Sequence, residues 1–98
     1  MLYIGADHGG FKLKAHLKKF LKSRGVAVMD LGAKTLKADD DYPDYAKLVS
    51  KKVSVKPHQD LGILICRSGQ GVCIVANKFK NVRAASVWNE KEAAVSRT

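Results

Sequence analysis

A thiol, a glycine turn and a helix start follow one another in a pattern that suits base catalysis. An apolar run from Leu61 to Ile65 ends on Cys66, and Gly69 and Gly71 come before an apolar stretch of helical length. This order predicts a buried strand that brings a thiol to its C-terminal tip, with a helix beginning beside it. Ligands of open parallel sheets bind at such tips, and a helix N-terminus attracts anions and favours a thiolate over a thiol. The segment therefore predicts a reactive base beside an anion site.

An acid and an imidazole form a second candidate cluster. Asp7 and His8 follow an apolar run over residues 2–6, and Gly9 and Gly10 separate them from a helical pattern. The glycine spacing matches neither the dinucleotide-binding fingerprint nor a Walker A loop. Taken alone, Asp7 is a helix cap and His8 a loop residue.

A third cluster surrounds Tyr42, which stands among acids in residues 41–45. Taken alone, this segment is a helix start, because the helix dipole favours acids in the first turn. All three clusters follow expected strands, so in a parallel sheet they would meet at one edge. Three weak signals at one place favour a binding or catalytic site there.

The elements that must position these residues alternate along the chain. We expect strands over residues 2–6, 26–31, 62–66 and 82–87, and helices over 11–23, 43–55, 69–79 and from 89 onward. This order predicts the α/β class, a three-layer αβα Rossmann-like sandwich with a parallel sheet. Four strands are visible, and a fifth strand or closing helix is missing. Residues 1–98 are therefore expected to form a single domain that is incomplete at its C-terminus.

The chain is strongly basic, with 18 Lys and Arg against 9 Asp and Glu and a net charge of +9. In the helix expected over residues 11–23, lysines flank an apolar stripe. The lysines are Lys12, Lys14, Lys18, Lys19 and Lys22, and the stripe is Leu13, Leu17, Phe20 and Leu21. This pattern is typical of a solvated helix face. Without a basic patch interleaved with aromatic residues, we expect no nucleic-acid partner, although the positive field would attract phosphorylated metabolites.

The apolar runs and the cysteines indicate the setting. No apolar run approaches the roughly 20 residues that cross a bilayer. We expect no signal peptide before residues 2–6, and therefore a cytoplasmic protein with no membrane partner. Cys66 and Cys73 form no CxxC pair, and Cys73 is expected to be buried and inert in a helix. His16 and His58 lack ligand spacing to the cysteines. Neither a metal nor a cofactor is expected.

Several segments resemble ribose-5-phosphate isomerase B and its relatives, which include allose-6-phosphate and galactose-6-phosphate isomerases. They read Gly-Ala-Asp-His-Gly-Gly-Phe-Lys-Leu-Lys at residues 5–14, Asp-Tyr-Pro-Asp-Tyr-Ala at 41–46, Gly-Ile-Leu-Ile-Cys-x-Ser-Gly-Gln-Gly-Val-x-Ile-x-Ala-Asn-Lys at 62–78, and Val-Arg-Ala-Ala at 82–85. The family interconverts aldose and ketose phosphates without a metal, through a cis-enediolate. The resemblance therefore implies an isomerase, with conversion of ribose 5-phosphate to ribulose 5-phosphate as its reaction.

The resemblance also implies roles for individual residues. Cys66 matches the base that takes the proton from C2 of the open-chain sugar, and Ser68 matches a hydroxyl beside the base or the reacting oxygens. The backbone N–H groups from Arg67 to Gly71 match the anion hole. The remaining substrate-binding matches are Asp7, His8, Tyr42, Gly69 and Gln70.

Two departures from the family pattern bear on activity. Arg67 stands where the family has glycine: it is strained there if the turn needs a positive φ, it could fill the pocket, and its cation would stabilise the Cys66 thiolate. The family's homodimers or homotetramers supply a His-Asn pair across the subunit interface, and this chain ends at Thr98 before that pair. The alternative function is therefore a non-catalytic member that binds a phosphosugar or a partner chain.

Overall fold

The fold, seen in a computed structural model, alternates strands and helices. The structure describes residues 1–6, 10–32, 42–65, 70–87 and 90–96. In these ranges the elements are β1 (Leu2–Ala6), α1 (Phe11–Ser23), β2 (Val28–Asp30), α2 (Tyr42–Val55), β3 (Leu61–Ile65), α3 (Gln70–Asn77) and α4 (Glu90–Ser96). The order confirms the alternation predicted from the sequence as far as α3, although β2 is shorter than expected.

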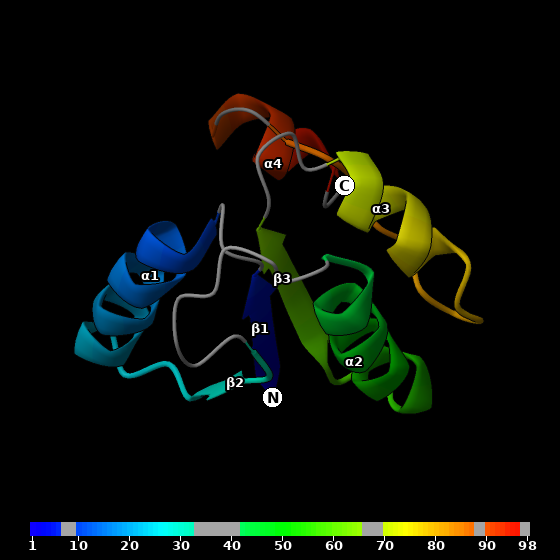
Figure 1. Cartoon of the computed structure of the whole chain (residues 1–98). Coiled ribbons are helices and arrows are strands. Elements are labelled where there is room, and N and C mark those ends of the chain that lie inside the picture. The colour runs from blue at the N-terminus through cyan, green and yellow to red at the C-terminus, as the bar shows by residue number, and fades with distance from the viewer. Residues whose placement is uncertain (7–9, 33–41, 66–69, 88–89, 97–98) are drawn as a thin grey trace.

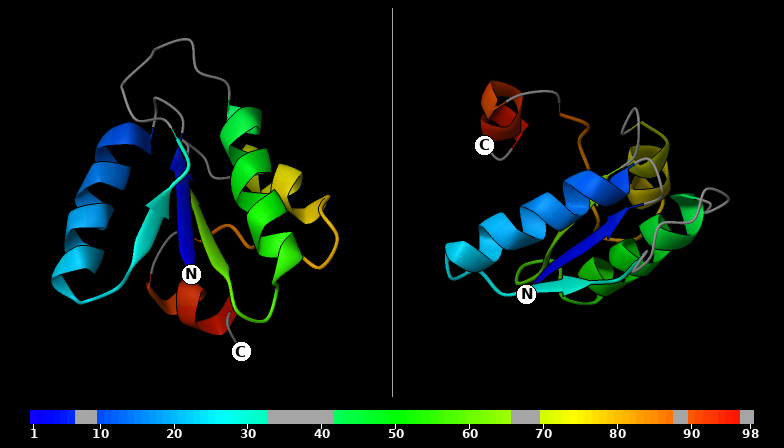
Figure 2. Two further views of the ribbon diagram at one scale, coloured as in Figure 1. Left: turned by 90° about the horizontal axis from the view of Figure 1, so that it is seen from below. Right: turned by 60° about the vertical axis from the view of Figure 1, so that its left-hand side comes forward.

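The described strands form one parallel sheet in the order β2-β1-β3. In the register, Leu2 lies opposite both Val28 and Leu61, and Ala6 lies opposite Ile65. The chain first steps from β1 to one neighbour and then crosses to the other, so right-handed connections place α1 and α2 on opposite faces. Figures 1 and 2 show this arrangement, with α3 beside α2 and α4 standing away from the strands. The α/β class and its layers are confirmed.

The core lies between one face of the sheet and the helices α2 and α3. Its buried apolar side chains are Ile4, Ala6, Ala46, Val49, Val72 and Ala76. They come from β1, α2 and α3. The central strand is therefore packed mainly through α2, which contacts both β1 and β3.

The C-terminus of α1 confirms the glycine cap predicted at residue 25. Gly25 has a φ of 75°, which only glycine adopts without cost. The Gly25 N–H donates to the Lys22 carbonyl at 3.1 Å, and the Val26 N–H donates to the Leu21 carbonyl at 2.9 Å. These two bonds make a Schellman motif, which ends α1 and turns the chain toward β2.

The prediction that the lysines of α1 face solvent is wrong for Lys14. The Lys14 side chain is 2% exposed, whereas Leu13 and Phe20 of the predicted apolar stripe are 52% and 48% exposed. The reason is an ion pair that crosses from the helix to β2, where Asp30 faces Lys14. A buried charge needs such a partner, and the partner decides which side of the helix turns inward.

The strand predicted over residues 82–87 is also wrong, because these described residues carry no regular secondary structure. The Ala84 N–H donates to Asn77 Oδ1 at 2.8 Å, and Asn77 Nδ2 donates to the Ala84 carbonyl at 3.0 Å. A side-chain amide thus takes both backbone groups that a neighbouring strand would pair. The Cys73 thiol, 3.4 Å from the same carbonyl, is half-buried rather than buried.

Candidate active site

The sheet register aligns the two segments expected to carry the base and the acid. Ala6 and Ile65 are the last residues of β1 and β3 and lie opposite each other. In the sequence, Asp7 follows Ala6 directly and Cys66 follows Ile65 directly. Because β1 and β3 are parallel, their carboxyl ends share one edge of the sheet, where ligands of such folds bind.

The N-terminus of α1 lies against the end of β3. Gly10 is the N-cap residue of α1. A Cβ atom at Gly10 would lie 2.5 Å from Ile65 Cγ2 and 2.7 Å from the Ile65 carbonyl oxygen. Only glycine leaves room for this approach, which brings the positive end of the α1 dipole to the same sheet edge.

The first turn of α2 closes the β2 side of this edge. The Ala6 N–H donates to the Gly32 carbonyl at 2.9 Å, which carries the sheet pairing past the end of β2. Gly32 has a φ of 137°, and a Cβ there would overlap the Tyr45 ring. The start of α2 at Tyr42 is therefore held beside the ends of β1 and β2.

The structure places some of the predicted site residues and leaves others outside its described ranges. Tyr42 is the first residue of α2, and Gln70 and Gly71 are the first two residues of α3. The others, Asp7, His8, Cys66, Arg67, Ser68 and Gly69, lie outside the described residues. Their roles remain predictions, and the structure supplies the elements that flank them.

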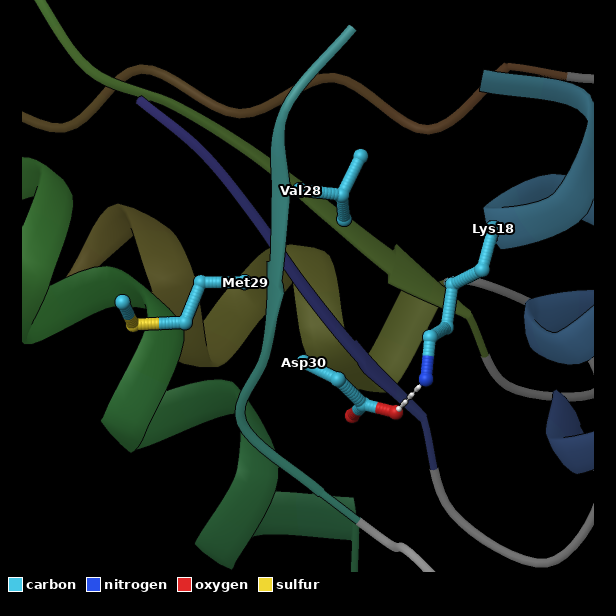
Figure 3. Close-up of a pocket in the computed structure, with 4 residues that line it drawn as sticks. All are labelled: Lys18, Val28, Met29 and Asp30. Atoms are coloured by element: carbon cyan, nitrogen blue, oxygen red, sulfur yellow. Dashed lines mark hydrogen bonds and ion pairs between the residues drawn. The ribbon is translucent and has the colours of Figure 1, made fainter. Parts of the chain in front are cut away.

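Sequence reasoning missed a charged cluster that joins α1 to β2. Lys14 Nζ lies 2.9 Å from Asp30 Oδ1, and Lys18 Nζ lies 2.8 Å from Asp30 Oδ2, the pair that Figure 3 draws. The Gly32 N–H also donates to Asp30 Oδ1, at 2.9 Å. An available signal was the Asp-Leu-Gly sequence at residues 30–32, which is typical of a side chain that bonds the backbone two residues on.

The surroundings of Asp30 set the charge state of this cluster. Burial alone raises the pKa of the Asp30 carboxyl, but hydrogen bonds from Lys18, Lys14 and the Gly32 amide together outweigh it, and the pKa lies below its ordinary value. Asp30 is therefore a carboxylate at neutral pH. It balances one of the two lysines and leaves a net positive charge between α1 and β2.

A surface hollow of about 500 Å³ adjoins the cluster and is lined by Lys18, Val28, Met29 and Asp30. Figure 3 shows Val28 and Asp30 on the α1 side of β2 and Met29 on the opposite side, as strand alternation requires. The described residues that line this hollow belong to α1 and β2. Among the described residues, no helix has the length and apolar character to cross a membrane.

Fold and site together define an α/β protein whose candidate site lies at the C-terminal edge of a parallel sheet. The model of the ribose/galactose isomerase family matches residues 2–98, and the chain belongs to this family. The resemblance noted in the sequence is thereby confirmed.

Individual relatives match over nearly all of this chain. The crystal structure of ribose-5-phosphate isomerase B from Mycoplasma genitalium with bound ribulose-5-phosphate is 49% identical, with a TM-score of 0.95, and the match covers 98% of this chain and 63% of that one. The structure of ribose-5-phosphate isomerase B from Clostridium thermocellum is 41% identical, with a TM-score of 0.90, and the match covers 98% of this chain and 64% of that one. Ribose-5-phosphate isomerase B of Mycobacterium tuberculosis is 38% identical, over 98% of this chain and 59% of its own length. The chain thus spans less than two thirds of these relatives.

Proposed function

We propose that this chain carries out the proton-transfer step of a sugar-phosphate isomerase, the interconversion of ribose 5-phosphate and ribulose 5-phosphate. The observation that carries the proposal is the aligned end of β1 and β3 in a member of this family. The relative with bound ribulose-5-phosphate superposes with a TM-score of 0.95. These observations favour a phosphosugar as the ligand of this edge.

The proposed base is the Cys66 thiolate. It removes the proton on C2 of the open-chain aldose, and the electron pair of that C–H bond forms the C1–C2 double bond of a cis-enediolate while the π pair of the C1 carbonyl moves onto O1. The same proton, or one from solvent, then returns to C1, while a proton moves from O2 to O1. A thiol with an ordinary pKa of about 8.5 serves as a base near neutrality once that pKa is modestly lowered.

The remaining predicted residues take supporting roles in this proposal. Backbone N–H groups from Arg67 to Gly71 hold the developing oxyanion, and Ser68 donates to a reacting oxygen. Gln70 and Gly71 begin α3, so their N–H groups belong to a helix start that lacks intrahelical acceptors. Asp7, His8 and Tyr42 hold the sugar phosphate from the neighbouring strand ends.

The setting follows from the same chemistry. The Cys66 base must remain a free thiol, so we place the protein in the reducing cytoplasm. As in the family, the proposed assembly is a homodimer or homotetramer.

Solvent deuterium exchange tests the proposal. The chain is incubated with ribulose 5-phosphate in D2O, and deuterium at C1 of the ketose and C2 of the aldose is followed by NMR. Cys66→Ala should lower the exchange rate by about 100- to 10,000-fold, the usual contribution of a positioned base. The matched control is Cys73→Ala, which removes the half-buried thiol of α3. This variant should leave the rate within about twofold, since Cys73 lies in the middle of α3 and not at the end of a strand.

The outcomes separate the two candidate functions. Exchange that persists in Cys66→Ala would refute the assignment of the base. Binding of ribulose 5-phosphate by calorimetry, without any exchange in the unmodified chain, would support the non-catalytic alternative.

A further inference from the structure

A single carboxylate in the structure connects three elements that border the candidate active site. Asp30 accepts hydrogen bonds from Lys14 and Lys18 of α1 and from the backbone N–H of Gly32. Its side chain is 11% exposed, and that of Lys14 is 2% exposed. Charged groups this far from water keep their geometry only while each retains its partner.

The cluster also reaches the end of the central strand. The Gly32 N–H is fixed by Asp30, and the Gly32 carbonyl accepts from the Ala6 N–H at 2.9 Å. Ala6 lies opposite Ile65. The Gly32 N–H and the Gly32 carbonyl belong to adjacent peptide planes that share the Gly32 Cα, so loss of the Asp30 bond frees one side of the residue that accepts from Ala6.

The same carboxylate holds the helix on the other side of this edge. Lys14 lies one turn from the start of α1, and that start packs against Ile65 through Gly10. Lys18, which is 42% exposed, makes a second ion pair with Asp30 one turn farther along the helix. Asp30 therefore links the position of α1 to the positions of β1 and β2.

We propose that Asp30 is a positioning residue for the reaction at this edge: through Lys14 and Gly32 it sets how the N-terminus of α1 lies against the ends of β1 and β3. This inference rests on the proposed function. It predicts that Asp30 governs the rate of proton transfer more than the affinity for the sugar phosphate, because small misplacements of reacting groups reduce the rate steeply.

The test compares two ion-paired carboxylates of low exposure at opposite ends of the sheet. Asp30→Asn keeps the shape of the side chain and removes its charge. The matched control is Asp60→Asn, because the Asp60 side chain is 9% exposed against 11% for Asp30 and is ion-paired at 3.0 Å from the Met1 ammonium, but precedes β3 at the opposite edge. Both variants remove a paired charge of low exposure, so they should lose comparable stability.

Amide hydrogen exchange by NMR reports the local geometry. Asp30→Asn should speed exchange at Gly32 and Ala6 by about tenfold relative to Leu61, because local opening affects the bonds near the lesion first. In Asp60→Asn the pattern should reverse, since Leu61 donates to the Met1 carbonyl at that edge. Equal acceleration of all three amides in Asp30→Asn would overturn the inference.

Deuterium exchange into ribulose 5-phosphate reports the effect on the reaction rate. It is measured at a temperature well below the unfolding midpoints of both variants. Asp30→Asn should lower kcat by about 10- to 100-fold and leave KM within about threefold. Asp60→Asn should keep both values, and Asp30→Glu, which keeps the charge but shifts the carboxylate, should recover part of kcat. Full kcat in Asp30→Asn would overturn the positioning role alone, whereas an unmodified chain without any exchange would overturn the proposed function as well.

Discussion

The packing of Gly10 against β3 makes Gly10→Ala a sharp probe of the candidate site. The added methyl group would meet Ile65 Cγ2 at 2.5 Å, the Ile65 carbonyl oxygen at 2.7 Å and Ile65 Cβ at 2.8 Å. The backbone at Gly10 has a φ of −108°, which alanine tolerates. The effect of the substitution is therefore a steric one.

The size of the effect follows from these distances. Carbon atoms in contact lie about 3.5–4.0 Å apart, so α1 and the end of β3 must separate by about 1 Å. Overpacking of this kind costs about 2 kcal/mol of unfolding free energy, which lowers the midpoint of a chain this long by about 10 °C. A shift of about 1 Å beside reacting groups lowers the rate by about 100-fold.

Two measurements separate stability from positioning. Thermal unfolding gives the midpoint, and deuterium exchange into ribulose 5-phosphate at low temperature gives the rate. The control is Gly25→Ala at the other end of α1, where a Cβ meets nothing within 4 Å and the φ of 75° alone costs about 1–2 kcal/mol. This control should lower the midpoint and keep the exchange rate.

The reasoning fails if the two variants behave alike. A Gly10→Ala variant with an unchanged midpoint would show that α1 does not approach β3 so closely. A lowered midpoint with an unchanged exchange rate would show that this contact does not position the site.

Three further predictions concern other contacts. The lowered pKa of Asp30 contributes stability that is present above the unfolded pKa of about 3.9 and is lost as pH falls through the folded pKa. In urea unfolding, the unmodified chain should therefore have a higher free energy of unfolding than Asp30→Asn at pH 7, and this difference should disappear below about pH 4. Asn77→Ala removes both bonds to Ala84 and should cost about 1–2 kcal/mol in the same assay, and a cost near zero would contradict the role given to that amide. Arg67→Gly should tighten ribulose 5-phosphate binding in calorimetry, because a small residue frees the turn, and weaker binding would contradict this expectation.

The local pattern of the sequence predicts the helices well. The bounds of α1 agree with the sequence because both ends carry local signals, namely the glycines before Phe11 and the Schellman glycine at Gly25. β1 and β3 were predicted within one residue, since each is an apolar run of strand length. Such signals lie within a few residues of the element that they define.

The buried face of α1 depends on a contact that is distant in the sequence. Lys14 looks like a surface residue beside Leu13 until Asp30 is placed opposite it. The same holds for residues 82–87, whose pattern is that of a strand, although the Asn77 amide takes the backbone groups that a strand would need. Periodicity does not record which side chain will compete for a backbone group.

The candidate site was predicted as a meeting of three clusters at one edge, and it stays a prediction; the described residues show only the elements that flank it. Ala6 and Ile65 are aligned, and the N-terminus of α1 packs there through Gly10. The parallel arrangement made this predictable, because it places every strand end on the same side. The bond from Gly32 to Asp30 had a local signal in the sequence, but the pairing of Asp30 with Lys14 and Lys18 had none, since these lysines resemble those of any soluble helix.

The position of β1 at the centre of the sheet has a consequence for synthesis. β1 leaves the ribosome before both of its partners, because one of its ladders needs β2 and the other needs residues 61–65. Until β3 emerges, one side of an apolar strand stays without its partner, which slows folding and invites contacts between nascent chains. Translation speed between β2 and β3 should therefore influence the yield of native protein.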